Sequence, residues 1–468
     1  MKDIINKIKE TFKNDIIHKE INIGKNNTIN ILFLESLCSG DKVNDYILKN
    51  ITTKTKIYDI SSILPSPNTK EIASNKIDYY LENAYTIVIH KEKIVAVETR
   101  AEIFRSVSKP ESESSITGPK DAFTENYQMN IGLIKRRLKT SSLKIDNLTI
   151  GRRTKTQIGI LYCEDIVEDK TLNDLKSRLG TIDIDGIIDS ENLALLLSQN
   201  DKANFPTIKK TERPDLTSNA LLEGKIAIVV DNSCFVLILP AFFTDFINPQ
   251  SDNYTKSGNI NFVEILRLAC FFISMMAPAI YIALINYNQE SIPTSLLINF
   301  ALQRDGVPFP ALIEALITIL TCEILRESDL RFPNAYGSAI SILGALVLGE
   351  AAVSAGIVSP IMIIVIATTF ISSLVFTEYD IITALRHYRF VFLFAAALYG
   401  IIGILLALLY FLIRINDIYS FGKPYFFPIA PFEKTYFKKT VVRGKMKNDT
   451  KRSAMLTNKD KTKMKSEG

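Results

Sequence analysis

Glu350 is a carboxylate in the second half of a long apolar run that extends from Ser338 to Gly356. A charged side chain inside a membrane helix is costly unless it faces water or a partner, and such residues therefore mark functional sites by default. If this run spans a bilayer, Glu350 predicts a polar path or an ion site. In the alternative interpretation, Glu350 lies close enough to one end of the helix for its carboxylate to reach the lipid headgroups.

Small residues form a stripe along the same run. They recur at spacings of three and four, which places them on one helix face: Ser338, Ser341, Ala345, Gly349, Ala352 and Gly356. A second stripe consists of Ala396, Gly400, Gly403 and Ala407. Small residues let helix backbones approach closely in lipid, where no hydrophobic effect drives helices together. The stripes predict either packing within one subunit or contact between subunits around a shared axis.

Hydroxyl side chains gather in the last third of the next apolar run, 358–376. They are Thr368, Thr369, Ser372 and Ser373. Two interpretations stay open, because Ser and Thr in a helix either donate to the carbonyl four residues earlier or line a polar path. The first role is structural, whereas the second would make Thr368 and Ser372 pore candidates.

Enzyme motifs are missing from this sequence. It has no phosphate-binding Gly-x-x-x-x-Gly-Lys-Ser/Thr loop, no dinucleotide Gly-x-Gly-x-x-Gly, no His-Glu-x-x-His and no Gly-x-Ser-x-Gly. The five cysteines and three histidines are scattered, which predicts reduced structural cysteines and no zinc site. We therefore expect no enzymatic activity and no cofactor. The basic cluster 135–137 is typical of a solvated helix face, so no nucleic-acid partner is predicted.

The first 258 residues have the charged composition of a soluble α/β protein. Residues 1–28 predict a basic leader with a mildly amphipathic helix, either solvated or touching lipid headgroups. No signal peptide is visible there, because an apolar segment is missing. Two small α/β lobes in tandem follow, at 29–100 and 101–258. Since the first segment that could enter a membrane lies some 260 residues into the chain, both lobes are expected in the cytoplasm.

Apolar runs and capping residues predict the elements of these lobes. Strands are expected at Ile29–Leu34, Tyr85–Ile89, Ile94–Glu98, Gln157–Tyr162, Lys225–Val230 and Phe235–Leu239. Helices are expected from Asp41 onward, at 71–81, 121–138, 171–179 and 187–197, and from Pro214 to Gly224. The pattern therefore favours an α/β fold for the whole N-terminal region.

The second half, 259–432, predicts an α-helical polytopic membrane domain. Four segments approach the ~20 residues that cross a bilayer, namely 268–287, 338–356, 358–376 and 390–413. The segment 311–325 is short and carries Glu314 and Glu323, so we expect it to be re-entrant; if it crosses, the spans number five. The tail 433–468 is basic and poor in apolar residues, which predicts disorder. Four spans favour a cytoplasmic tail, where Lys and Arg concentrate.

Motifs spread over residues 98–431 resemble the GerA-type spore germination proteins. In chain order they are Pro110, Glu113, Ile116, Gly118-Pro119, Phe123-Thr124-Glu125, Asn130, Arg136-Arg137, Thr211-Glu212-Arg213-Pro214-Asp215, Leu221–Gly224, Ile292-Pro293, Val307-Pro308-Phe309-Pro310, Glu314, Glu323–Glu327, Arg331–Pro333, Gly349–Gly356 and Ser420–Tyr425. None of these is generic to membrane proteins.

The resemblance implies the A subunit of a nutrient germinant receptor in the spore inner membrane. It further implies a permease-like B subunit and a lipoprotein C subunit as partners, and an oligomer that forms a nutrient-gated ion channel. A paralogue associated with dipicolinate release is a second placement within the family. A secondary transporter and a non-conducting signalling scaffold are the alternatives from other classes. The sequence shows no internal repeat and no paired broken helices, features that transporters usually have.

Overall fold

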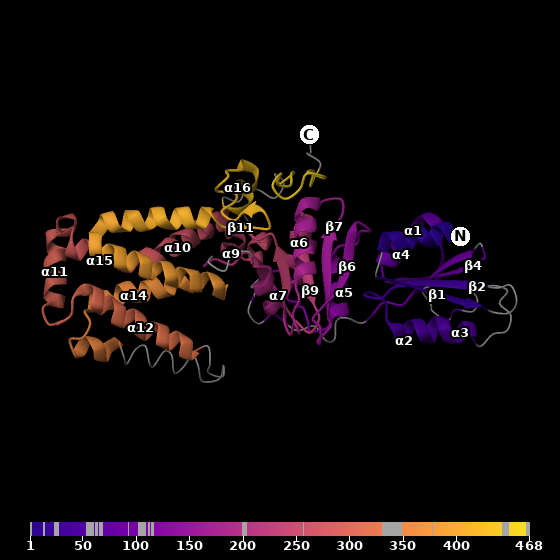
Figure 1. Ribbon diagram of the computed structural model, residues 1–468, viewed down its shortest axis with the longest axis horizontal. Helices are drawn as coiled ribbons and strands as arrows, with labels where there is room; N and C mark the ends of the chain where they lie inside the picture. Colours follow the sequence, from indigo (N-terminus) through magenta and orange to yellow (C-terminus); the bar gives the residue numbers. More distant parts are fainter. Residues whose placement is uncertain are drawn as a thin grey trace.

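The structure is a computed structural model that describes residues 2–12, 15–22, 28–52, 60, 64, 69–91, 93–101, 109–110, 113, 117–198, 204–255, 257–329, 349–376, 378–441 and 449–464. Three parts follow one another along the longest axis: a first lobe, a second lobe and a helical bundle (Figure 1). The N-terminus lies in the first lobe at one end of the molecule. The C-terminal segment returns from the bundle and ends over the second lobe.

The first lobe is an antiparallel sheet covered by helices on both faces. Its strands are β1 (Ile16–Asn22), β2 (Thr28–Leu34), β4 (Tyr85–His90), β5 (Lys93–Glu98) and β3 (Thr69–Glu71), adjacent in that order. Helices α1 (Lys2–Phe12) and α4 (Ile77–Glu82) bury their apolar residues against one face. The continuous helical stretch from α2 (Gly40–Val43) to α3 (Lys49–Thr52) covers the other face.

Residues 1–28 differ from the predicted solvated leader. Ile5, Ile8 and Phe12 of α1 are buried in the core of the first lobe. Strand β1 pairs with β2 along its whole length, from Ile16 opposite Leu34 to Asn22 opposite Thr28. The apolar stripe of α1 is thus the stripe of a helix that packs on a sheet, and this segment belongs to the lobe.

The second lobe has the same architecture as the first. Its strands are β6 (Leu143–Ile150), β7 (Thr156–Cys163), β9 (Ile226–Val230), β10 (Val236–Leu239) and β8 (Lys209–Thr211), adjacent in that order and antiparallel. Helices α5 (Tyr127–Arg137) and α8 (Pro214–Leu222) pack on one face. Helices α6 (Asp169–Thr181) and α7 (Ser190–Leu197) pack on the other.

The two lobes repeat one topology. In each, the sheet order is first, second, fourth, fifth and third strand of that lobe. A helix precedes the first strand, helices that cover the opposite face follow the second strand, and another helix follows the third. This internal repeat was not visible as sequence periodicity. The chain therefore stacks two copies of one fold end to end before it reaches the bundle (Figure 1).

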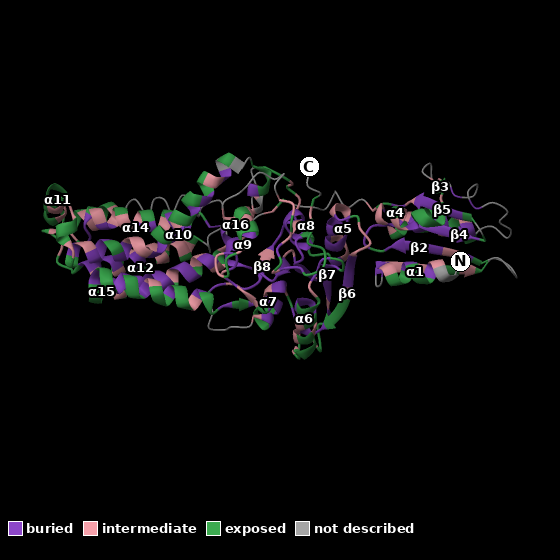
Figure 2. Ribbon diagram, turned by 90° about the horizontal axis from the view of Figure 1, so that it is seen from above, coloured by how far each residue is buried: buried purple, intermediate pink, exposed green. Residues whose placement is uncertain are grey.

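The bundle contains α10 (Ser257–Asn286), α11 (Thr294–Arg304), α12 (Ala311–Asp329), α14 (Pro360–Ser373) and α15 (Tyr379–Asn416). Within the described residues, Ile260–Asn286 and Tyr379–Asn416 are long and apolar enough to cross a membrane by length and composition. Large apolar side chains are exposed on the outer faces of the bundle and buried on its inner faces (Figure 2), among the exposed ones Leu320, Ile364, Ile371, Leu398, Leu405 and Ile413.

Helix α15 is a hairpin of two arms, 379–399 and 401–416, instead of the single span predicted at 390–413. Gly400 has the non-helical angles φ 59° and ψ −136°. The rings of Tyr388 and Phe411 have centroids 5.0 Å apart, although these residues would be about 35 Å apart along a straight helix. Both ends of α15 therefore lie at the second lobe, and Gly400 lies at the far end of the bundle beside Tyr287.

The tail also differs from its prediction of disorder. After β11 (Tyr419–Ser420) and β12 (Lys423–Pro424), α16 (Lys434–Thr440) packs against the second lobe. Residues 449–464 lie on that lobe as well, where Leu456 is buried beside Phe242 and Tyr436. A basic segment with few apolar residues is ordered here because the lobe supplies an apolar cleft and acidic partners.

Candidate functional site

Arg213 is the centre of a buried polar junction on the second lobe, at the side that faces the bundle. Its Nε and Nη2 donate to the two carboxylate oxygens of Asp215 at 3.1 and 2.8 Å. Its Nη1 and Nη2 also donate to the backbone oxygens of Glu113 and Pro119, both at 3.3 Å. Pro214 occupies the first turn of α8 and holds Arg213 in an extended conformation, so that the side chain folds back onto Asp215.

Tyr254 connects this junction to the start of the bundle. It is the last residue of the short helix η5 (Gln250–Tyr254), which leads into α10. Its hydroxyl donates to Asp215 at 2.7 Å. Its ring lies so close to Gly118 that a Cβ there would be 2.5 Å away, and Gly118 has φ +102°. Only glycine fits this position, because the backbone is in a left-handed conformation and the Tyr254 ring leaves no room for a Cβ atom.

The carboxylate of Glu113 adds a buried acid to the junction. The hydroxyl of Thr211 and the backbone N–H of Glu212 donate to it, the latter at 3.1 Å. Burial raises the pKa of Glu113, whereas Lys209 and the Thr211 hydroxyl oppose that shift. We name the set Glu113, Gly118, Pro119, Arg213, Asp215 and Tyr254 the Arg213 junction.

Ion pairs join the same lobe to both long helices. Lys209 and Lys210 of the edge strand β8 lie 3.5 Å from Glu378 and 2.7 Å from Asp380, at the start of α15. Arg267 of α10 donates to Asp252 of η5 at 2.8 Å, and both side chains are buried. The lobe is thus attached to the bundle by paired charges as well as by the chain itself. Movement of β8 or α8 would be transmitted to both helices.

The structure brings most predicted motif residues of the second lobe together. Gly118, Pro119, Arg213, Pro214 and Asp215 meet in the junction, and the oxygen of Glu212 accepts from Phe123 N–H at 2.8 Å. Two hydrogen bonds next to the junction hold the β9–β10 turn. The backbone oxygen of Glu125 accepts from Asn232 N–H at 3.0 Å, and Asn130 Nδ2 donates to the backbone oxygen of Ser233 at 3.4 Å.

Two further motif residues of this lobe lie elsewhere. Pro110 is half-buried in the segment between the lobes, and Arg136 is a partly buried residue of α5.

Pro308, Pro310, Glu314 and Gly356, four of the predicted motif residues of the bundle, lie at the end remote from the lobes. Pro308 and Pro310 are exposed in the loop before α12. The buried Glu314 carboxylate accepts from the N–H of Ser359 at 2.7 Å and has Arg304 at 3.7 Å. A Cβ on Gly356 would lie 3.0 Å from the oxygen of Gly306, so the two loops touch there. This constellation closes the far end of the bundle.

Among the described residues, the pore candidates do not enclose a space within one chain. Glu350 is exposed, Gly349 is half-buried, and Ala352 packs at the edge of an apolar cluster. Thr368 and Thr369 donate to the oxygens of Ile364 and Val365 at 2.8 and 2.7 Å, which is the structural one of the two roles considered. Ser372 is buried. Ser338, Ser341, Ala345 and the motif 331–333 lie outside the described residues.

Several charged groups were not singled out from the sequence. Lys209, Lys210, Glu378 and Asp380 connect lobe and bundle, and their role depends on contacts between distant segments. The buried Arg389 and the partly exposed Arg386 are partners of Glu323 inside the bundle. Their position immediately before the apolar run that starts at Phe390 was a usable signal, because charges so close to a membrane segment need partners.

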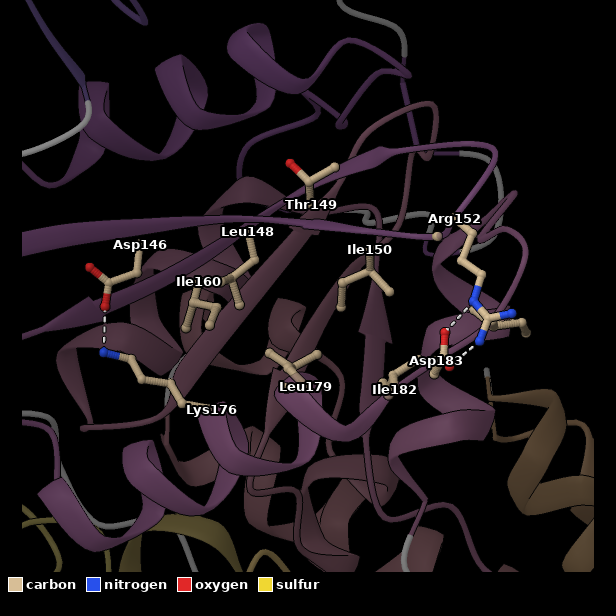
Figure 3. A pocket seen from close by; sticks show the side chains of 13 residues that line it. Asp146, Leu148, Thr149, Ile150, Arg152, Ile160, Lys176, Leu179, Ile182 and Asp183 are labelled. Atoms are coloured by element: carbon tan, nitrogen blue, oxygen red, sulfur yellow. Dashed lines mark hydrogen bonds and ion pairs between the residues drawn. The ribbon is translucent and has the colours of Figure 1, made fainter.

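The second lobe also has an open hollow of about 540 Å³ between β6 and α6 (Figure 3). Its floor is apolar and includes Leu148, Ile160 and Leu179. An ion pair flanks each end: Asp146 lies 2.5 Å from Lys176, and Arg152 Nε donates to Asp183 at 2.6 Å. The hollow has the chemistry to hold a small, largely apolar molecule with polar ends.

All five cysteines are unpaired. Burial raises the pKa of the Cys38 thiol to about 11 and that of the Cys163 thiol to about 12, so both stay protonated and inert. Across the described residues, no group of three His, Cys, Asp or Glu side chains is placed to hold a metal ion.

Comparison with known proteins gives a consistent result. The family model described as Bacillus/Clostridium GerA spore germination protein matches residues 2–455. The chain is 36% identical over 459 residues to spore germination protein KA of Bacillus subtilis, covering 96% of this chain and 84% of that one. It is 33% identical to spore germination protein GerLA of Bacillus cereus, covering 96% and 94%.

One solved structure is also similar. It is the crystal structure of the N-terminal domain of the A subunit of the Bacillus megaterium spore germinant receptor GerK3, at 27% identity and a TM-score of 0.40. The match covers 51% of this chain and 94% of that one.

Proposed function

The chain belongs to the GerA family of spore germination proteins, and from this premise we propose that it is the A subunit of a nutrient germinant receptor in the spore inner membrane. Its partners are a permease-like B subunit and a lipoprotein C subunit. The bundle crosses the membrane several times, while both lobes and the tail are cytoplasmic. Within the family, the placement with the dipicolinate-release paralogue is the alternative.

Two features of the bundle support this placement. Its outer faces expose large apolar side chains over several helices, and such continuous apolar surface is typical of contact with lipid or another chain. The chain enters the bundle from the second lobe at α10 and returns to the same lobe after α15. An even number of crossings therefore keeps the lobes and the basic tail on one side, in agreement with the concentration of Lys and Arg on cytoplasmic sides.

The A subunit is proposed to oligomerise into a nutrient-gated ion channel. The ion pairs between β8 and the start of α15 are the observation that supports gating. They connect the lobe directly to the bundle, so a conformational change in the cytoplasmic lobe would move the start of α15. The exposed Glu350 beside Gly349 supports an oligomer, since the described residues of one chain leave this carboxylate exposed. Candidate residues for packing or for the pore are Ala345, Gly349, Glu350, Ala352, Gly356, Thr368 and Ser372.

Ion flux through the assembled receptor tests this function against the two alternatives. The complex is reconstituted in liposomes that are loaded with a monovalent cation, and nutrient is added. A channel conducts passively without saturation, a secondary transporter saturates, and a signalling scaffold produces no flux. A saturating or absent response in complexes that bind nutrient would exclude the channel.

A further inference from the structure

Three arginines surround one glutamate where α12 meets the first arm of α15. Arg386 Nε lies 3.2 Å from one carboxylate oxygen of Glu323, and Arg389 Nη1 lies 3.4 Å from the other. Arg326, one helical turn after Glu323, contacts it as well. Arg389 is fully buried, the side chains of Glu323 and Arg326 are 14% exposed, and that of Arg386 is 30% exposed.

The charges of this cluster do not balance. Three guanidinium groups and one carboxylate leave a net charge of +2, and arginine does not lose its proton in proteins. Nη2 of Arg389 and Nη1 of Arg326 are buried and have no hydrogen-bond partner among the described residues. The undescribed segment 330–348 contains no Asp or Glu that could compensate. Buried charged donors without partners are costly, so the described residues leave these two donors available to an anionic acceptor.

Neighbouring groups hold the arginines in place. The backbone oxygen of Ser274 in α10 accepts from Arg389 Nε at 2.9 Å. The ring of Phe370 in α14 lies under Arg389 and Arg326, with centroid distances of 4.6 and 5.6 Å. Both guanidinium planes are thus fixed by four helical segments before any ligand arrives, and such preorganisation lowers the entropic cost of binding.

The cluster lies in the half of the bundle that faces the lobes. Arg386 follows Tyr379, the start of α15 at the second lobe, by roughly 10 Å along the helix. Guanidinium groups recognise phosphate oxygens through paired hydrogen bonds, and basic pockets between membrane helices on this side bind anionic headgroups. We infer that Arg326, Arg386 and Arg389 form a binding site for a phosphate group, supplied either by an anionic phospholipid or by free phosphate. This site goes beyond the proposed receptor function; its lipid source rests on the membrane placement proposed above, whereas binding of free phosphate does not.

The test uses the full chain, purified and delipidated in detergent. One arm counts bound phosphatidylglycerol against phosphatidylcholine by native mass spectrometry. The other arm measures the melting temperature in sodium phosphate against sodium chloride at equal ionic strength. The variants are Arg386→Gln at the rim of the site, Arg386→Lys, which keeps the charge but loses the planar fork, and Lys438→Gln as a charge-matched control on the exposed face of α16.

Uptake of phosphatidylglycerol identifies a lipid source, and stabilisation by phosphate identifies a soluble one. In either case we expect Arg386→Gln to weaken binding of the lipid or of phosphate roughly tenfold. Arg386→Lys should weaken this binding less, and Lys438→Gln should leave it unchanged. The proposal is overturned if the parent chain responds to neither probe, or if Arg386→Gln, folded by circular dichroism, responds as the parent does.

Discussion

Arg213 is the residue on which the junction depends most. Replacing it with Ala would leave the Asp215 carboxylate buried without its partner and remove the donors to the Glu113 and Pro119 oxygens. Breaking a buried ion pair by removing one partner costs about 3–5 kcal/mol. We therefore expect Arg213→Ala to lower the melting temperature of the full chain in detergent by several degrees. Lys170→Ala, an exposed control in α6, should change it by less than one degree.

A melting temperature of Arg213→Ala equal to that of the parent would mean that Asp215 and Tyr254 hold the junction without the guanidinium. In that case the junction would be a packing contact, and the charge on Arg213 would have no structural role.

Substitutions at Glu350 and Gly349 distinguish a role of the Glu350 charge in ion flux from a role of this helix face in packing. Glu350→Gln keeps the size and removes the charge, so it should lower cation flux several-fold or change selectivity while assembly stays intact. Gly349→Leu should instead reduce the yield of oligomer, because a large side chain prevents close helix approach. Flux in liposomes and size-exclusion chromatography measure the two effects. Parental flux in Glu350→Gln would make Glu350 a residue that reaches the headgroups, with Thr368 and Ser372 examined next.

At the residue scale, sequence reasoning succeeded where the chemistry is local. The i−4 hydrogen bond of Thr368 was one of two stated alternatives, and the structure shows it. Arg213 and Asp215 were found only through the family resemblance, because their partners Glu113 and Tyr254 lie far away in the sequence, whereas Pro214 was also expected to open a helix. Arg389 was missed because its acid, Glu323, lies on another helix.

Helix α15 shows how an element escapes prediction. Its apolar composition continues across Gly400, and a continuous apolar run predicts one span. The reversal needs the left-handed conformation of Gly400 and the hydroxyl of Tyr287, which donates to the oxygen of Ala397 at 2.6 Å. The stripe of small residues in this run is buried between the two arms, so it packs within one subunit.

At the scale of secondary-structure elements, the ion pairs between β8 and α15 predict that reversing one charge impairs flux. Asp380→Lys places two cations together at the end of β8, so it should reduce nutrient-triggered flux several-fold. Adding Lys210→Asp restores opposite charges between β8 and α15, although it removes the pair of Lys210 with Glu191, and should recover part of the flux. Lys176→Asp, which breaks an ion pair with Asp146 inside the second lobe alone, is the matched control. If the double variant is as impaired as Asp380→Lys, the pairing does not couple the lobe to the bundle.

The central strands of both lobes were predictable, whereas their edges were not. Apolar runs gave β2, β4, β5, β7, β9 and β10 to within a few residues, since a strand that is buried on both faces is apolar throughout. The edge strands β1, β3 and β8 are short or polar and were missed. Because the edge strands β1, β3 and β8 were not predicted, the repeated topology of the lobes could not emerge from the sequence.

At the scale of the whole molecule, the tail links the chain's end to its middle. Lys439 and Lys463 both contact the buried carboxylate of Glu223, at the end of α8. Tail and α8 are thus joined on the lobe that carries the Arg213 junction. A segment that sequence composition marks as disordered is in this way packed on the second lobe.

Acid should release this tail. Burial alone would raise the pKa of Glu223, but Lys439 and Lys463 outweigh it and lower the pKa below its ordinary range. Although burial opposes it, Glu223 and Asp449 raise the pKa of Lys463 to about 12. A carboxylate with a lowered folded-state pKa contributes stability above the ordinary Glu value of about 4.3, and that stability is lost as pH falls through the folded-state pKa.

Hydrogen exchange of residues 449–464 in the full chain measures the release. Protection, measured relative to the intrinsic exchange rate at each pH, should be high at pH 7 and should fall as the pH drops through the lowered pKa of Glu223. Glu223→Gln should show lower protection already at pH 7, because it leaves two half-buried lysines with Asp449 as their one remaining carboxylate among the described residues. Asp169→Asn removes only the exposed pair with Lys459 and should exchange like the parent at pH 7. Slow exchange in Glu223→Gln at pH 7 would show that Leu456 and its apolar neighbours hold the tail without the charges.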